Sequence, residues 1–177
     1  RSDAMEQMLD RVEAIVAAGN HLILQGEPST DRGKVADMTA NQVFRRKNGK
    51  RWRLDFSSAK EPERLLFGSP KVAGYRRHIG ILELATDADF VVIKGLKAAS
   101  SEIQNKIAQI FMTGDYCLTG EGKTRRCSTR FILIADKHSD ADAPQDPDLI
   151  EVFHKAAIQV PPLRDRIEDI ALLVRVF

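Results

Sequence analysis

The stretch that most constrains the fold is a short apolar run that ends in glycine and leads through a turn-rich loop into a helical pattern. The run is His21–Gln25, and it ends at Gly26. Glu27–Lys34 suits a loop, and apolar positions recur at helical spacing over Val35–Phe44. This order predicts a buried strand, a loop and a helix, an arrangement that holds phosphate through backbone amides and the helix start.

The loop has the architecture of a P-loop but lacks its binding residues. A functional loop reads G-x-x-x-x-G-K-[ST]. Counting from Gly26, Asp31 takes the place of the second glycine, Arg32 that of the lysine and Gly33 that of the magnesium ligand. The carboxylate of Asp31 would repel a triphosphate, and a forked guanidinium is not equivalent to an ammonium. We interpret the loop as a strand-to-helix turn, with a residual anion site as the alternative. The degenerate loop comprises Gly26, Glu27, Ser29, Thr30, Asp31, Arg32 and Gly33.

Apolar runs alternate with amphipathic helical patterns along the rest of the chain. This alternation predicts an α/β fold of three layers, in which helices flank a mostly parallel sheet of about five strands, as one domain over residues 1–177. The further predicted strands are Trp52–Phe56, Phe90–Ile93, Phe131–Ala135 and Ala156–Val160. The predicted helices are Met5–Val16, Pro62–Gly68, Ile79–Leu84, one capped by Ser100 or Ser101, Leu149–Phe153 and one from Ile167. Cys117–Arg130 suits a polar hairpin or loop.

Composition argues against several classes of protein. A net charge of +2 does not mark the whole chain as a nucleic-acid binder. Two cysteines, Cys117 and Cys127, cannot form a secreted disulfide framework, so we expect a reducing cytoplasm and read both thiols as spectators. No apolar run approaches the roughly 20 residues of a membrane span. Ser2–Met5 suits a helix cap rather than a signal peptide.

Two basic segments are candidates for partner contact. One is Arg45–Arg53, which includes Trp52, and the other is Arg76–His78. Either would suit nucleic acid or an acidic partner, although a solvated turn is the more common role of such a run. The candidate contact residues are Arg45, Arg46, Lys50, Arg51, Arg76 and Arg77.

Other reactive residue types form no recognisable site. The acidic stretch Asp136–Asp142 matches no standard metal motif, so a loop without metal is expected. His21 and His154 are interpreted as structural residues. Glu83 and Asp87 are interpreted as surface charges.

Five segments occur in the order and at roughly the spacing of a known family. They are Ser2–Met5, Leu24–Glu27, Leu66–Gly68, Gly80–Ala85 and Pro161–Ile170. Together they resemble the central AAA+ domain of NtrC-type bacterial enhancer-binding proteins, the activators that remodel sigma-54 RNA polymerase. The last segment is the most specific, because it is close to the family pattern P-P-L-R-x-R-x-x-D-I. The resemblance covers nearly the whole chain and implies an AAA+ core that stops where the family's helical lid begins.

The departures from this family fall on its catalytic positions. Its Asp-Glu pair, which holds magnesium and polarises the attacking water, would fall on Ile93 and Lys94. Its threonine–asparagine sensor would fall on Ala135–Asp136, and its two arginine fingers on Asp146 and Val152. Without these groups, the resemblance implies no ATP hydrolysis.

We therefore expect a pseudo-ATPase module of a sigma-54-activator-like transcription regulator, serving in assembly or contact with other regulator subunits. No cofactor is expected unless the altered loop still binds ATP and magnesium. Direct sigma-54 contact is not expected, because the stretch between Gly68 and Gly80 is too short for the family's GAFTGA loop. DNA contact would come from regions outside this chain, and no membrane contact is expected. Two alternatives remain open: a domain that senses a nucleotide or cyclic dinucleotide at the altered loop, and a weak residual ATPase.

Overall fold

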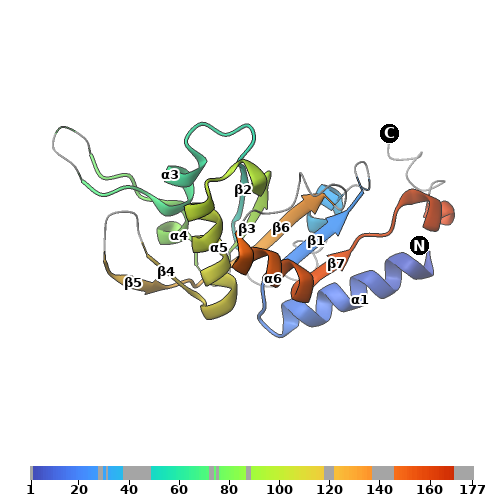
Figure 1. Ribbon diagram of the computed structural model, residues 1–177. Helices are drawn as coiled ribbons and strands as arrows, with labels where there is room; N and C mark the ends of the chain where they lie inside the picture. Colours follow the sequence, from blue (N-terminus) through green and yellow to red (C-terminus); the bar gives the residue numbers. More distant parts are fainter. Residues whose placement is uncertain are drawn as a thin grey trace.

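A parallel sheet forms the centre of the molecule (Figure 1). The computed structural model describes residues 2–27, 30, 32–37, 49–71, 74, 76–86, 89–117, 122–136 and 146–169. Within these residues, five parallel strands pair in the order β2-β3-β6-β1-β7. Their bounds are β1 Leu22–Gly26, β2 Arg51–Asp55, β3 Phe90–Lys94, β6 Arg130–Asp136 and β7 Ala157–Gln159. The predicted fold class is confirmed.

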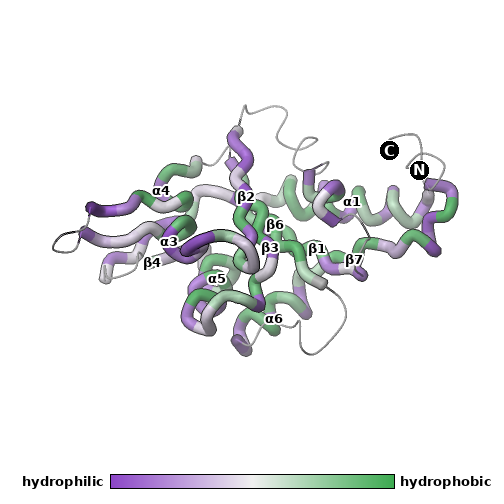
Figure 2. Tube along the Cα trace, turned by 90° about the horizontal axis from the view of Figure 1, so that it is seen from above, coloured by the Kyte–Doolittle hydropathy of each residue, from purple (hydrophilic) through white to green (hydrophobic). Residues whose placement is uncertain are grey.

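Helices cover both faces of the sheet, because the central strands are apolar on both sides. On one face, Leu22, Leu24 and Val92 pack against α1 (Asp3–Ala17) and against Val35 in the helical residues 32–37. On the other face lie α3 (Pro62–Phe67), α4 (Ile81–Leu84), α5 (Ser101–Thr113) and α6 (Pro147–Ala156). Figure 2 shows apolar residues gathered along β3, β6 and β1 between these layers. A strand whose alternate side chains enter two cores reads as a continuous apolar run.

Polar side chains set the starts of the two longer helices on the second face. Ser100 caps α5 by accepting the amide of Ile103 at 3.4 Å. Asp146 caps α6 by accepting the amide of Leu149 at 3.1 Å. The buried Gln104 joins the two helices, because its side-chain oxygen accepts the backbone amide of Asp146 at 3.2 Å. The position that the family would give to an arginine finger is thus occupied by a helix cap.

Several element boundaries differ from the prediction. The helix after the first loop already includes residues 32–34, ahead of the predicted start at residue 35, and residues 31 and 38–48 lie outside the described part. The last strand loses Ala156, because α6 extends through that residue. The segment read as hairpin or loop contains an antiparallel pair, β4 (Asp115–Cys117) and β5 (Thr124–Arg126). Short 3-10 turns complete the described elements, η1 at Leu96–Ala98 and η2 at Leu163–Asp165. None of the described helices combines the length and apolar character that crossing a membrane requires.

Candidate functional site

The candidate site lies at the carboxyl ends of β1, β3 and β6, where parallel α/β sheets place their ligands. Gly26 ends β1 in a space that admits no side chain: an added Cβ would lie 2.9 Å from the Thr30 hydroxyl and 3.3 Å from the Val160 carbonyl oxygen. The Thr30 hydroxyl donates to the Glu27 carbonyl at 2.8 Å, which closes a turn. Ser29 and Asp31 lie outside the described residues. The turn predicted for this loop is therefore present at its described positions.

Arg32 joins the ends of two strands. Its Nη1 donates to the Gly26 carbonyl at 2.9 Å, at the end of β1. The same nitrogen donates to the carbonyl of Ala135, in β6. In a functional P-loop the cation at this position contacts the β- and γ-phosphates. Here that nitrogen contacts backbone carbonyls of the protein itself.

The segment with the most specific family pattern braces the same loop. Both guanidinium Nη atoms of Arg164 donate to the carboxylate of Glu27, each at 2.7 Å. The buried Arg166 donates to the Thr30 carbonyl at 2.8 Å. The R-x-R pattern thus places two arginines on two residues of the loop after β1.

Asp169 fastens this segment to the start of the chain. Its carboxylate accepts the backbone amide of Ser2 at 2.9 Å and the Ser2 hydroxyl at 3.0 Å. Both residues are buried. Ser2 occupies the predicted N-cap position of α1, but its side chain makes no capping hydrogen bond and donates to the distant aspartate instead.

The end of β3 carries no carboxylate. Ile93 is buried in the core of the second face, whereas Lys94 is exposed. A Cβ added to Gly33 would lie 3.8 Å from the Lys94 Nζ. An ammonium therefore stands beside the residue that takes the magnesium-ligand position. Such an arrangement cannot bind a metal ion through these two residues, because neither offers an anionic or neutral oxygen side chain.

The predicted contact residues have different environments. Arg51 donates to Asp37 at 2.9 Å, and Arg53 donates to the same carboxylate oxygen. Lys50 is exposed, and its backbone amide donates to Asp89 at 2.5 Å. Arg45 and Arg46 lie outside the described residues. Partner contact by this segment stays a prediction.

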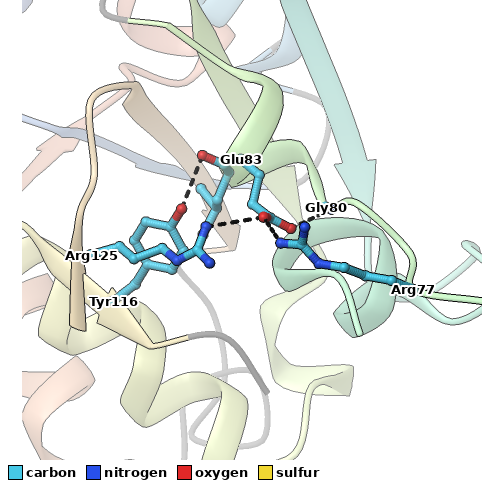
Figure 3. A network of polar contacts seen from close by, with 6 residues as sticks. Arg77, Gly80, Glu83, Tyr116 and Arg125 are labelled. Carbon is cyan, nitrogen blue, oxygen red and sulfur yellow. Dashed lines mark hydrogen bonds and ion pairs between the residues drawn. The ribbon is translucent and has the colours of Figure 1, made fainter. Parts of the chain in front are cut away.

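A second polar cluster forms around α4, between the segment before it and the β4–β5 pair (Figure 3). The Glu83 carboxylate accepts from Arg77 and, at 3.1 Å, from Arg125 of β5. Its other oxygen accepts the Gly80 amide at 3.4 Å. The Glu83 side chain is only 9% exposed, so the expectation of a surface charge was wrong. Tyr116 of β4 adds a bond from its hydroxyl to the Leu82 carbonyl at 3.2 Å. Arg77 is thus engaged within the chain.

The two ends of the segment from Ser69 to His78, which precedes α4, are hydrogen-bonded to each other. Ser69 and His78 exchange backbone hydrogen bonds at 2.9 and 3.1 Å. A Cβ on Gly80 would lie 2.3 Å from the amide nitrogen of Gly68, so these two backbones approach too closely for any side chain. Arg76 is exposed in this segment. These distances explain why glycine begins one family-like segment and ends another.

His21 and Cys127 have environments that suit structural roles. His21 packs against Phe111 and Phe131 with ring centroids 4.6 and 5.4 Å apart. Burial lowers its pKa to about 4, although a backbone hydrogen bond with Ile110 opposes this shift. Burial raises the pKa of the Cys127 thiol to about 11, which suppresses the nucleophilic thiolate.

The strand order and the position of the loop after β1 match the P-loop NTPase fold with an AAA+ core, and solved structures share this fold. The crystal structure of NtrX from Brucella abortus superposes with a TM-score of 0.76 and 24% identity, covering 99% of this chain and 40% of that one. The NtrX complex with ATP gives a TM-score of 0.74. No protein-family model matches the chain.

Sequence relatives extend along the whole chain. The formate hydrogenlyase transcriptional activator of Salmonella typhimurium is 29% identical over 187 residues, covering 100% of this chain and 26% of that protein. The Nif-specific regulatory protein of Klebsiella pneumoniae is 27% identical, covering 98% of this chain and 34% of that protein. The chain is therefore similar over nearly its full length to bacterial transcription regulators, and it shares its fold with NtrX. It spans about a quarter to a third of the length of these two relatives.

Proposed function

We propose that this chain is the AAA+ module of a cytoplasmic sigma-54-activator-like regulator, that it no longer hydrolyses ATP, and that it serves in assembly or partner contact. The full-length similarity to sigma-54 activators supports the regulator class. One observation carries the loss of hydrolysis: Arg32 donates from the lysine position to the carbonyls of Gly26 and Ala135. A hydrogen-bonding group used in this way is withdrawn from a phosphate.

The neighbouring residues support the same conclusion. Phosphoryl transfer depends on positioning and charge neutralisation, including a metal ion and a residue that orients the attacking water. Gly33 has no side chain to offer a metal, and Ile93 is apolar and buried. The ammonium of Lys94 replaces a water-polarising carboxylate. At the arginine-finger positions, Asp146 caps a helix and Val152 packs against the core.

Contact with other regulator subunits is the second part of the proposal. The relatives are activators of a class that acts as oligomers, which favours self-association. Lys50 and Arg76 are exposed and available for such contacts. Direct sigma-54 contact through a GAFTGA loop is not part of the proposal, since the chain carries no such sequence between Gly68 and Gly80.

The test of hydrolysis combines two measurements on the purified chain, magnesium-dependent phosphate release and a thermal-shift screen of nucleotides. We expect no release above a heat-denatured sample, and no nucleotide-specific rise in melting temperature. Release that disappears in the Arg32→Ala variant would overturn the proposal in favour of a residual ATPase. A nucleotide-specific rise that Arg32→Ala abolishes, without release, would favour the sensing alternative.

Assembly is tested separately by sedimentation over a wide range of protein concentration. We expect self-association that weakens in a Lys50→Glu, Arg76→Glu double variant. A monomer at every concentration, in the presence and absence of nucleotide, would contradict self-association.

A further inference from the structure

A cavity of about 400 Å³ lies beside the loop after β1, between the helical residues 32–37 and the ends of β2 and β3. Its volume falls within the range of small-molecule sites, which span roughly 300–1,000 Å³. Nothing in the function proposed above uses it. The inference drawn from it goes beyond that function and does not depend on nucleotide binding.

Apolar side chains form part of the cavity wall. Leu54, Val92 and Ile134 come from three neighbouring strands, β2, β3 and β6. Leu65 of α3 also lines the cavity and is 37% exposed, although it is a large apolar residue. Leu54 and Val92 are already buried, so the apolar surface that a compact ligand would remove from water, at about 25 cal/mol per Å², belongs mainly to Leu65.

Charged side chains line the same cavity, and its carboxylates are already engaged. Asp37 accepts from both Arg51 and Arg53 through one oxygen. Asp55 accepts the backbone amide of Ser57 at 2.9 Å. Asp37, Arg53 and Asp55 all line the cavity, and Arg51 borders it through its ion pair with Asp37.

Lys94 is the cation of the cavity wall that takes part in none of these contacts. It lines the cavity, and within the described part of the chain its ammonium has no hydrogen-bond or ion-pair partner. Among the charged residues that line the cavity, Arg53 is paired with Asp37, and Asp55 accepts a backbone amide, so Lys94 is the lining cation without a carboxylate partner in the described residues. A ligand that complements this ammonium carries one negative charge.

We propose that this cavity binds a small organic monocarboxylate, with its carboxylate on the Lys94 ammonium and its apolar body against Leu54, Val92 and Leu65. A charge-assisted hydrogen bond between ammonium and carboxylate supplies the orientation. A nucleoside triphosphate fits this cavity less well, because its several negative charges would face the carboxylates of Asp37 and Asp55. The cavity therefore favours ligands that carry a single negative charge and an apolar body.

The experiment is calorimetric titration of the full chain with aliphatic and aromatic monocarboxylates, including isovalerate and phenylacetate. Each acid is paired with its neutral amide, such as phenylacetamide. We expect at least one acid to bind at a single site, and its amide to bind about tenfold more weakly, because the amide forfeits a hydrogen bond to a charged group.

Two variants locate the effect. Lys94→Met should remove the preference for acid over amide, while Lys71→Met, an exposed lysine in the segment that Ser69 and His78 close, should keep it. Circular dichroism melting of both variants checks that they are folded. The proposal is overturned if no acid binds at millimolar concentration, if acid and amide bind equally, or if Lys94→Met keeps the preference. None of these results bears on ATP hydrolysis, so the two proposals fail independently.

Discussion

Two cations stand near each other at the carboxyl edge of the sheet, and the fold uses them differently. Arg32 follows β1 and donates to the carbonyls of Gly26 and Ala135. Lys94 ends β3, and its ammonium has no hydrogen-bond or ion-pair partner within the described residues, although it lies beside Gly33. Arg32 thus stabilises the fold, whereas the ammonium of Lys94 remains available to a ligand. The comparison shows that two cations at one edge of a sheet can differ, one bonded to the backbone and the other without a side-chain partner in the described part of the chain.

The chemistry of the two side chains accounts for this difference. A guanidinium is planar, has five N–H donors and is weakly hydrated, so it can bridge carbonyls at the ends of two strands. An ammonium is compact and strongly hydrated, and at an exposed strand end it remains in water until an anion replaces that water. The ends of β1 and β6 are therefore tied together at Arg32, whereas the end of β3 is not.

Among the variants that test this comparison, Arg32→Met should cause the largest loss of unfolding free energy. The substitution leaves the carbonyls of Gly26 and Ala135 without this donor, which should lower the free energy of unfolding by about 1–3 kcal/mol. Urea unfolding measures the loss. Arg32→Lys serves as the control, and it should recover only part of the stability, because the shorter lysine side chain does not place its ammonium where the Nη1 of Arg32 reaches both carbonyls. Equal stability of Arg32→Met and the unchanged protein would break the comparison.

Acidic pH should cause the next largest loss of unfolding free energy. This loss should be the same whether Arg32 or Lys94 is replaced. The pKa of His21 is lowered by burial from 6.5 to about 4 in the folded state. The unfolded chain therefore binds this proton first, so stability is complete above pH 6.5 and is lost as the pH falls toward 4. Between pH 7 and pH 5 the loss should be roughly 2 kcal/mol.

The variant that tests this pH effect is His21→Phe, which keeps an aromatic ring beside Phe111 and Phe131. Its unfolding free energy should fall less between pH 7 and pH 5 than that of the unchanged protein. Arg32→Met and Lys94→Met should both retain the full loss, since His21 precedes β1 at the opposite end from these cations. A His21→Phe variant with an unchanged pH slope would refute this assignment.

A smaller effect is expected from Glu27→Gln, which weakens the ion pair with Arg164. This pair is bidentate, but the Arg164 side chain is 66% exposed, and solvent screens such pairs. The loss of stability should be clearly smaller than that of Arg32→Met, and it should shrink further in high salt. A loss as large as that of Arg32→Met would show that the brace, rather than Arg32, holds the loop.

The smallest effect is expected from Lys94→Met in the absence of ligand. An exposed side chain without a partner in the described residues should change the free energy of unfolding by no more than about 0.5 kcal/mol. The same urea titration measures it. A larger loss would mean that Lys94 is structural, which would remove the contrast with Arg32.

The fold was predictable from sequence because β1, β3 and β6 are continuous apolar runs. Counting from Gly26 also located Arg32 at the lysine position. Its acceptors were not predictable, because Ala135 lies 103 residues away and contributes only a backbone carbonyl. The burial of Glu83 was missed for the same reason, since Arg125 lies 42 residues later in the chain.

The helix-cap role of Asp146 was also missed, although the local sequence does indicate it. Asp146 directly precedes Pro147 and is followed by an apolar helical pattern, which is the signature of an N-cap with proline at the first helical position. The cavity beside Lys94 had no such signal. Its wall combines residues from β2, β3, β6 and α3, and only the folded chain brings these together.

The contact between Asp169 and Ser2 connects the two ends of the described chain. Asp169 grips the residue that begins α1, and the same short segment reaches the loop after β1 through Arg164 and Arg166. The start of α1 and the loop after β1 are therefore joined through one short segment, by side-chain contacts that lie outside the strand pairing of the sheet.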